Sequence, residues 1–409
     1  MYSSAMRAAA FVLALAGLSA GGLAPIPPSE DPWYAAPPGF ESATPGAIFK
    51  IRRAAGNLTA IYNSSAVYNI LYRTTDSQYQ PSWAVTTLYL PPAGAPTPAP
   101  PHKTAPFLTW LHPYDSNYID ASPSFLFYQA NTPFVQDLPA ALARGWWVSV
   151  PDYEGPRASF TAGVMSGHAV LDSVRAVRAA GLGIGKRNPA ALWGYSGGGL
   201  AAEWAAELHA GYAPELDLAG VAIGSPVANV SDVLYNVNGK PLAGLIPPSL
   251  LGLTSQYPDA QKYLIGRLRP ATKQAFLAAR KQSWVESIQA FAGQDMAAYF
   301  VGGLADIFAP EMGLAWGRDT YMGYHGVPWM PVYVYQAIHD EIATIGYTAA
   351  LVERFCRVGA NVVFEKNTVG GHLEELTAGA PGAVRWLTSI FDGTYAQKYP
   401  SVGCDSFEV

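Results

Sequence analysis

A single serine stands among glycines in the stretch GYSGG at 194–198 of this 409-residue chain. A serine hydroxyl is a weak nucleophile until a base removes its proton, and G-x-S-x-G is typical of a tight strand-to-helix turn that exposes such a serine. An apolar run, AALW at 190–193, precedes this pattern, and a helical run, LAAEWAA at 200–206, follows it. A second match, GLSAG at 17–21, lacks that setting. We therefore interpret Ser196 as a nucleophile, and the alternative is a flexible glycine turn.

A nucleophilic serine of this kind needs a histidine base and an acid that follow it in the order Ser, acid, His. Among the histidines beyond Ser196, His372 comes after the last predicted strand and a VGG turn, directly before a helical segment. We therefore expect His372 to be the base. The acid is expected in the loop after the strand at 331–338, which offers Asp340, with Glu341 as the alternative. The other interpretation of this pair is a solvated loop.

Predicted strands and helices alternate along the chain, which favours an α/β fold with a mostly parallel central sheet covered on both faces. Because the carboxyl ends of parallel strands meet at one edge, Ser196, Asp340 and His372 are expected to lie together there. An apolar, helical stretch separates the strands at 220–226 and 331–338. We predict a core formed by 21–226 and 329–409, and a cap or lid formed by 227–328. The predicted strands are 68–73, 82–90, 106–115, 188–196, 220–226, 331–338 and 361–366, and the predicted helices are 161–181, 200–210, 346–358 and 383–393. The stretch 141–155 is predicted as a helix end, a glycine stop and a further strand.

The first twenty residues carry one arginine and then an apolar stretch that ends in small residues. This pattern is typical of a secretory signal peptide, so we predict a leader at 1–20, an extracellular protein and no transmembrane segment. Secretion agrees with two cysteines that could form one bridge, and with N-glycosylation sequons at Asn57, Asn63 and Asn229.

Composition argues against several other classes of protein. Charged residues make up 13% of the chain, the net charge is −5, and no basic run is present, which argues against nucleic acid as a partner. The sequence has no clustered histidine or cysteine ligand set and no dinucleotide fingerprint. We therefore expect no metal and no organic cofactor.

Several ordered motifs resemble those of the fungal secretory lipases, a family of the α/β-hydrolase superfamily. They are DYEGPRASFTAGVMSGHAVLDSVRAV at 152–177, GYSGGG at 194–199, HDE at 339–341 and GHLEEL at 371–376. The resemblance runs from about residue 32 to residue 404. It implies an α/β-hydrolase fold with a helical cap, and hydrolysis of carboxylic esters that include triacylglycerols. By this resemblance Ser196 is the nucleophile, Asp340 the acid and His372 the base.

The resemblance also implies roles for four further residues. The turn HPYDSNYIDASPS at 112–124 is similar to the family's oxyanion segment, which assigns the backbone N–H groups of Asp115 and Gly197 to an oxyanion hole. Cys356 and Cys404 match the family's C-terminal disulfide. A second bridge that members commonly carry is not expected, because Ala121 stands at the matching position.

The leading functional hypothesis is thus a secreted triacylglycerol lipase or esterase that uses a Ser-Asp-His triad through an acyl-enzyme. Its substrate would be an ester or lipid, including one at a lipid–water interface. The alternative is a short-chain carboxylesterase or deacetylase acting on small acylated metabolites. A peptidase and a non-catalytic, hydrolase-like binding protein are weaker alternatives, and binding proteins of that kind typically lose a member of the triad.

Overall fold

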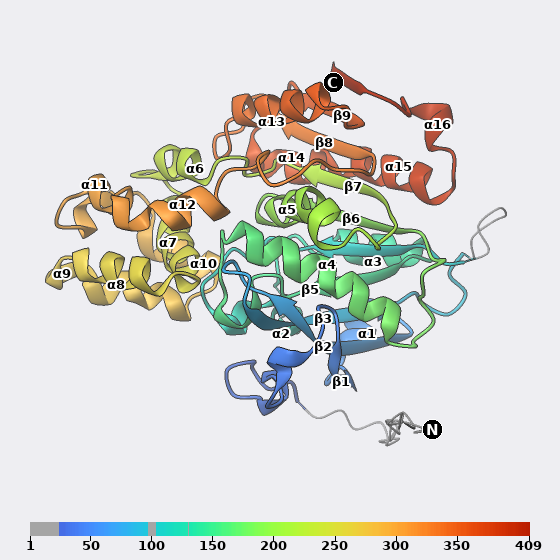
Figure 1. The fold of residues 1–409 in the computed structure, drawn as a ribbon, viewed down its shortest axis with the longest axis horizontal. Coiled ribbons are helices and arrows are strands. Elements are labelled where there is room, and N and C mark those ends of the chain that lie inside the picture. The colour runs from blue at the N-terminus through green and yellow to red at the C-terminus, as the bar shows by residue number, and fades with distance from the viewer. Residues whose placement is uncertain (1–23, 97–103, 130) are drawn as a thin grey trace, which may run out of the picture.

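A 10-stranded sheet runs through the molecule, with helices on both of its faces and a further group of helices beyond the ends of its strands (Figure 1). The computed structural model describes residues 24–96, 104–129 and 131–409, so the predicted leader at 1–20 lies outside the described residues. The strands are β1 (Ile48–Arg53), β2 (Ala66–Thr75), β3 (Pro81–Leu90), β4 (Phe107–Leu111), β5 (Trp147–Pro151), β6 (Ala190–Tyr195), β7 (Leu218–Gly224), β8 (Val332–Ala337), β9 (Val362–Asn367) and β10 (Cys404–Glu408).

The helices fill the connections between these strands. They are α1 (Leu58–Ile61), α2 (Pro123–Leu126), α3 (Asp137–Ala143), α4 (Gly163–Ala179), α5 (Gly197–Tyr212), α6 (Val230–Val237), α7 (Ile246–Ser255), α8 (Pro258–Arg267), α9 (Pro270–Ala278), α10 (Trp284–Phe291), α11 (Leu304–Ile307), α12 (Gly313–Asp319), α13 (Ile345–Arg357), α14 (His372–Ala378), α15 (Ala380–Phe391) and α16 (Tyr395–Lys398).

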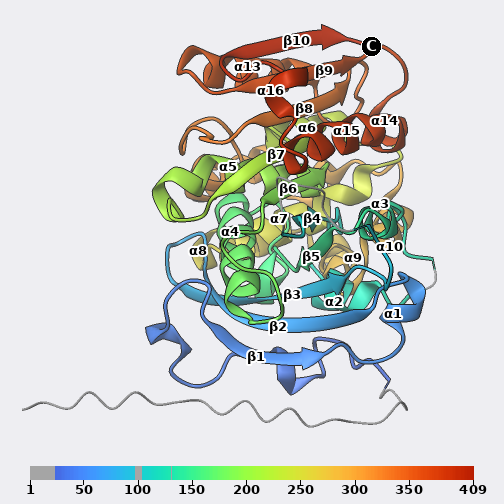
Figure 2. The ribbon, with the colours of Figure 1, turned by 90° about the vertical axis from the view of Figure 1, so that its right-hand side faces the viewer.

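The sheet has the order β1-β2-β3-β5-β4-β6-β7-β8-β9-β10, which Figure 2 shows as a stack from one end of the molecule to the other. In this order, neighbouring strands are antiparallel from β1 as far as β5. From β5 through β4 and β6 to β10, every neighbouring pair is parallel. All residues of β4 and β6 are buried, as expected for parallel strands that are covered on both faces. The predicted fold class, α/β with a mostly parallel sheet, is confirmed.

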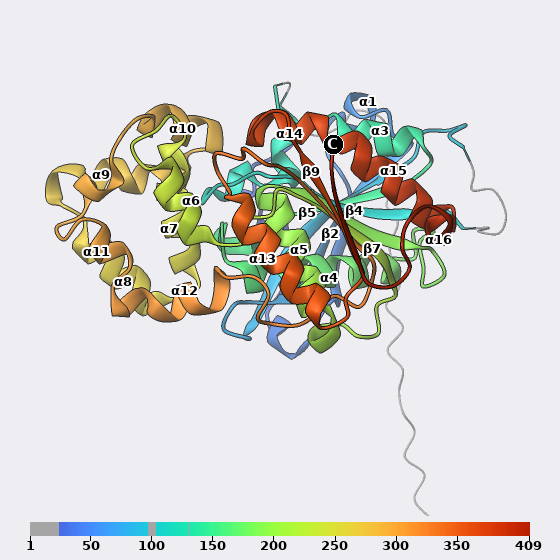
Figure 3. The same cartoon turned by 90° about the horizontal axis from the view of Figure 1, so that it is seen from above.

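Helices cover the sheet on two sides, as the view in Figure 3 shows. Helices α4, α5 and α13 lie on one side, and α3, α14 and α15 lie on the other. Large aromatic side chains fill the space between the layers, and Trp193, Trp204 and Trp386 are at most 2% exposed. This packing holds the central strands, and with them the strand ends that carry the site, in fixed positions.

Helices α6 to α12, which we call the insertion, follow β7 and precede β8. They gather beyond the ends of the strands, away from the helices that cover the two faces of the sheet (Figures 1 and 3). They span Val230–Asp319, inside the stretch 227–328 that the sequence predicts as a cap. Among the described residues, no helix is long and apolar enough to cross a membrane.

Candidate active site

Ser196 stands between the end of β6 and the start of α5, on a backbone turn with φ 54° and ψ −121°. A non-glycine residue rarely adopts such angles, and a conformation of this kind is typical of a nucleophile elbow. The neighbouring glycines are required by close approach of the main chain. A Cβ on Gly194 would lie 2.0 Å from the carbonyl oxygen of Gly198, and a Cβ on Gly198 would lie 1.9 Å from that of Leu111. The glycine-rich stretch is therefore a packed turn and not a flexible one.

The structure brings Ser196, Asp340 and His372 together although they are far apart in the sequence. The Ser196 hydroxyl lies 2.8 Å from Nε2 of His372, and Nδ1 of the same imidazole lies 2.8 Å from Oδ2 of Asp340. His372 is 2% exposed and Asp340 is 9% exposed, so water screens these contacts little. The geometry suits transfer of the serine proton to the imidazole, with the aspartate stabilising the charged ring.

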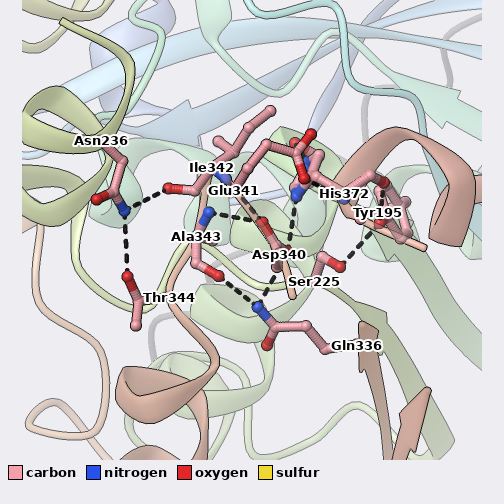
Figure 4. A network of polar contacts seen from close by, with 12 residues as sticks. Tyr195, Ser225, Asn236, Gln336, Asp340, Glu341, Ile342, Ala343, Thr344 and His372 are labelled. Atoms are coloured by element: carbon pink, nitrogen blue, oxygen red, sulfur yellow. Dashed lines mark hydrogen bonds and ion pairs between the residues drawn. The ribbon is translucent and has the colours of Figure 1, made fainter. Parts of the chain in front are cut away.

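Asp340 is surrounded by hydrogen-bond donors (Figure 4). Its Oδ1 accepts the backbone N–H groups of Ile342 and Ala343 at 2.9 and 2.8 Å, and its Oδ2 accepts the side-chain amide of Gln336 at 3.0 Å. Burial raises the pKa of this carboxyl, but hydrogen bonding to His372, the imidazole charge and the two backbone donors hold the pKa below its usual value. Asp340 therefore stays ionised at neutral pH and keeps the imidazole proton on Nδ1.

Two further side chains hold the main chain of His372. Oε2 of Glu341 accepts the backbone N–H of His372 at 2.7 Å, and the Tyr195 hydroxyl donates to its carbonyl oxygen at 2.6 Å. The Ser225 hydroxyl in turn donates to the Tyr195 oxygen at 2.8 Å. The alternative acid, Glu341, thus contacts the backbone of His372 while Asp340 contacts its ring (Figure 4).

Sequence reasoning missed Gln336, Tyr195 and Ser225 as parts of this network. Tyr195 occupies the variable position of the G-x-S-x-G pattern, and Gln336 stands within a strand predicted only from its apolar neighbours. Nothing in their sequence positions indicates which distant group each side chain contacts.

Asp115 and Gly197 lie beside Ser196. Asp115 follows β4 with φ 40°, and Gly197 is the first residue of α5. The two lie in contact, because a Cβ on Gly197 would come within 1.9 Å of Oδ1 of Asp115. The N-terminal end of α5 carries unpaired N–H groups and a partial positive charge, which favour a negative oxygen there.

Two apolar cavities meet at Ser196, and Asp115, Leu245 and Ile342 line both of them. The more enclosed cavity extends under α6, and its other walls are Phe160, Thr161, Leu200, Val227, Val230, Val233, Leu234 and Ser249, with Gly197 beside the serine. The more open cavity extends towards α10, and its other walls are Pro113, Phe134, Leu242, Trp284, Ile288, His372, Leu373 and Leu376. The site is therefore an apolar cleft with its polar groups concentrated at Ser196, as is usual for small-molecule sites.

The remaining predicted residues do not line these cavities. Cys356 and Cys404 form a disulfide that closes 48 residues and links α13 to β10. Asn57 and Asn63 are exposed, whereas Asn229 is 5% exposed and its side chain accepts the backbone N–H of Ser231 at the start of α6. Within the part of the chain that the structure describes, no group of three or more His, Cys, Asp or Glu residues is arranged to hold a metal ion.

Comparison with known proteins assigns the chain to a family. The secretory lipase family model matches residues 125–398. A trichothecene C-3 esterase of Fusarium sporotrichioides is 50% identical over 381 residues, which cover 91% of this chain and 85% of that protein. A probable trichothecene esterase of Stachybotrys chartarum is 40% identical over 394 residues, or 92% and 79% of the two chains. The closed state of Candida antarctica lipase A has a TM-score of 0.83 and 27% identity, covering 93% of this chain and 89% of that one. The predicted α/β-hydrolase fold is thereby confirmed, and the chain belongs to the secretory lipase family of carboxylic ester hydrolases.

Proposed function

We propose that this chain is a secreted serine esterase that removes a short acyl group from an apolar, polycyclic alcohol of the trichothecene type. The observation that carries the proposal is the 50% identity, over 91% of the chain, to a trichothecene C-3 esterase. The paired cavities support it. One cavity lies under α6 and the other beside Phe134 and Trp284, so the acyl and alcohol parts of an ester would have separate apolar spaces on either side of Ser196. The family's description as secretory supports export through the predicted leader at 1–20.

The proposed reaction has two steps. Ser196 attacks the ester carbonyl while Nε2 of His372 takes the hydroxyl proton, and Asp340 stabilises the imidazolium. The carbonyl electron pair moves to the oxygen, which the backbone N–H groups of Asp115 and Gly197 then stabilise. The tetrahedral intermediate collapses, Nε2–H protonates the leaving alcohol, and an acyl-enzyme remains. Water, deprotonated by the same histidine, releases the acid and restores Ser196.

A second candidate is hydrolysis of triacylglycerols at a lipid–water interface. It is favoured by the likeness to Candida antarctica lipase A and by exposed apolar residues near the open cavity, where Val285 is 37% and Leu373 is 45% exposed. Apolar surface next to a cleft is a common feature of sites that meet lipid.

A substrate profile tests the proposal. We would measure kcat/KM of the purified protein for p-nitrophenyl acetate and octanoate, tributyrin emulsion, and a trichothecene acetylated at C-3. We expect acetate to be preferred over octanoate by at least about tenfold, and the acetylated trichothecene over tributyrin. The Ser196→Ala variant should lose at least about a thousandfold in kcat. A preference for octanoate and tributyrin would instead support the lipase candidate. Wild-type protein that neither hydrolyses any ester nor reacts with a fluorophosphonate would refute both.

A further inference from the structure

Phe134 and Trp284, which we call the aromatic pair, lie at the mouth of the more open cavity. Their ring centroids are 5.8 Å apart with an angle of 25° between the ring planes, so the two rings are stacked. Both side chains line that cavity and are half-buried, whereas Ile342 and His372 in its wall are buried. The aromatic pair therefore presents its surface to any molecule that enters this cavity from outside.

The two rings come from different parts of the fold. Phe134 lies in the core between α2 and α3, and Trp284 is the first residue of α10 in the insertion. Ser283 and Glu286 form a capping box that fixes the start of α10. The buried Ser116 hydroxyl of the core donates at 2.7 Å to a main-chain carbonyl oxygen two residues before Trp284. These contacts hold Trp284 in a fixed position against the core.

Phe134 has an uncommon backbone conformation. Its φ is 59°, in the left-handed region that bulky side chains rarely adopt. Backbone strain of this kind persists only where the surrounding structure imposes it, and it is concentrated at active sites and ligand clamps. The position of the Phe134 ring is therefore imposed by the fold, as is that of Trp284.

The chemistry of ester cleavage indicates which half of the substrate meets the aromatic pair. The leaving alcohol takes its proton from Nε2 of His372, so the alcohol oxygen must come within hydrogen-bond reach of that nitrogen. Of the two cavities that meet at Ser196, the open one has His372 in its wall, and the enclosed one has Gly197 and Leu200 instead. The alcohol half should therefore lie in the open cavity, beside the aromatic pair.

The walls of the open cavity limit the chemistry of that alcohol. Apart from Ser196, His372 and Asp115, each described residue that lines this cavity has an apolar or aromatic side chain. A charged or polyhydroxylated alcohol would lose its contacts with water there and gain few side-chain partners in return. Aromatic rings offer a large apolar contact surface, and a rigid ring system loses less conformational freedom on binding than a flexible chain does.

We propose that Phe134 and Trp284 are specificity-determining residues: they bind the alcohol half of the ester and select uncharged, rigid cyclic alcohols over flexible linear ones. The aromatic pair acts through contact with the substrate and takes no part in bond making or proton transfer. Because the acyl half would lie in the other cavity, the choice of acyl group should not depend on the pair. This inference rests on the proposed function, since it needs Ser196 to cleave esters.

The experiment compares cyclohexylmethyl acetate with n-heptyl acetate, two esters of primary alcohols that have equal carbon number and differ in ring closure. The ratio of their kcat/KM values measures the alcohol preference, and the ratio for p-nitrophenyl acetate and octanoate measures the acyl preference. The variants are Phe134→Ala, Trp284→Ala, the double variant, and Trp284→Leu, which keeps apolar bulk without an aromatic ring.

A matched control comes from another stacked pair of the insertion. Tyr235 of α6 stacks on Phe308 with ring centroids 5.2 Å apart, and neither residue lines the two cavities. Tyr235→Ala therefore removes a stacked ring of the insertion without changing the cleft. Thermal melting reports whether every variant is folded, and Trp284→Leu replaces Trp284→Ala in the comparison if the alanine variant is unfolded.

We expect the wild type to prefer the cyclohexylmethyl ester by at least about fivefold. Phe134→Ala, Trp284→Ala and Trp284→Leu should each lower that preference by at least about threefold, with the acyl ratio kept within about twofold of wild type. The two alanine effects should not multiply in the double variant, because the rings are in contact. Tyr235→Ala should keep both ratios.

The proposal is overturned if the wild type shows no preference for the cyclic alcohol, or if the variants of the aromatic pair keep that preference. It is also overturned if Tyr235→Ala lowers the preference as much, or if the variants of the pair change the acyl ratio as strongly as the alcohol ratio. If the wild type hydrolyses no ester, or prefers octanoate to acetate, the proposed function fails instead.

Discussion

Replacing Asp340 by asparagine separates the two roles of this side chain, which are to hold its own loop and to orient His372. The carboxylate accepts from the backbone N–H groups of Ile342 and Ala343 through one oxygen, and from Gln336 and Nδ1 of His372 through the other. An amide has only one oxygen, so Asp340→Asn cannot satisfy both sets of donors.

The structure indicates which set the asparagine keeps. Turning its NH₂ towards Ile342 and Ala343 would leave two buried N–H groups without an acceptor, at about 1–3 kcal/mol each. The amide oxygen should therefore stay with the backbone, and the NH₂ should face His372. Nδ1 of the imidazole then becomes the acceptor and Nε2 carries the proton towards Ser196, so the ring can no longer act as a base. We expect kcat to fall about 10⁴-fold, or about 5.5 kcal/mol, with a small change in stability.

The assay is kcat for p-nitrophenyl acetate, with thermal unfolding followed by circular dichroism. Glu341→Gln is the matched control, because its amide oxygen can still accept the His372 backbone N–H. This variant should lose less than about tenfold, since it removes a charge near a helix start but not the hydrogen bond. The reasoning is refuted if Asp340→Asn stays within tenfold of the wild type, or if Glu341→Gln loses as much as Asp340→Asn.

Two further predictions concern the disulfide and the glycines of the elbow. Replacing Cys356 and Cys404 by alanine should lower the free energy of unfolding by up to about 4 kcal/mol for the 48 residues closed, measured by denaturant titration. The kcat should stay unchanged, because Cys404 pairs with the first residue of β9, whereas His372 follows the last residue of that strand. A large loss of kcat would contradict this expectation. Gly198→Ala should abolish activity, since its Cβ would meet the carbonyl oxygen of Leu111 at 1.9 Å. The control is Gly211→Ala in α5, where nothing lies within 4 Å of the added carbon. This substitution should leave activity unchanged and raise the free energy of unfolding by about 0.5–1 kcal/mol. Equal activities of the two variants would argue against a packed elbow.

The position of the candidate site was predictable because its residues follow strand ends. Ser196 directly follows β6, and Asp340 and His372 come shortly after β8 and β9, each of which begins with a buried apolar run. Apolar runs of this kind are visible in sequence, and parallel strands place their carboxyl ends at one edge. Local pattern and topology together therefore suffice to bring the three side chains into one region, although not to give their distances.

The edges of the sheet were not predictable in the same way. Strand β10, with the sequence CDSFE, has no buried residue and no apolar alternation, so its own sequence gives no strand signal. It forms because it pairs with β9 and is tied to α13 by the disulfide. Strand β1 is likewise an outer strand, with its residues only half-buried or exposed, and it pairs with β2 alone. Both strands depend on contacts made elsewhere in the chain.

Helix starts were also shifted from their predicted places. The helix expected at 200–210 begins at Gly197, although three consecutive glycines disfavour helix formation. Close packing of the elbow against Leu111 and the main chain of Gly224 requires residues without a Cβ there, so tertiary contact overrides local propensity. Similarly, α14 begins at His372 itself, where Glu341 accepts the first N–H.

The insertion contacts the loop that carries Asp340 and also forms walls of the cleft. Asn236 of α6 donates to the carbonyl oxygen of Ile342 at 3.0 Å and to the Thr344 hydroxyl at 3.1 Å (Figure 4), and Asp232 accepts the backbone N–H of Thr344. Ile342 in turn donates its own N–H to Asp340. The same helix contributes Val233 and Leu234 to the enclosed cavity. The wall of the enclosed cavity and the position of Asp340 therefore both depend on contacts made by α6.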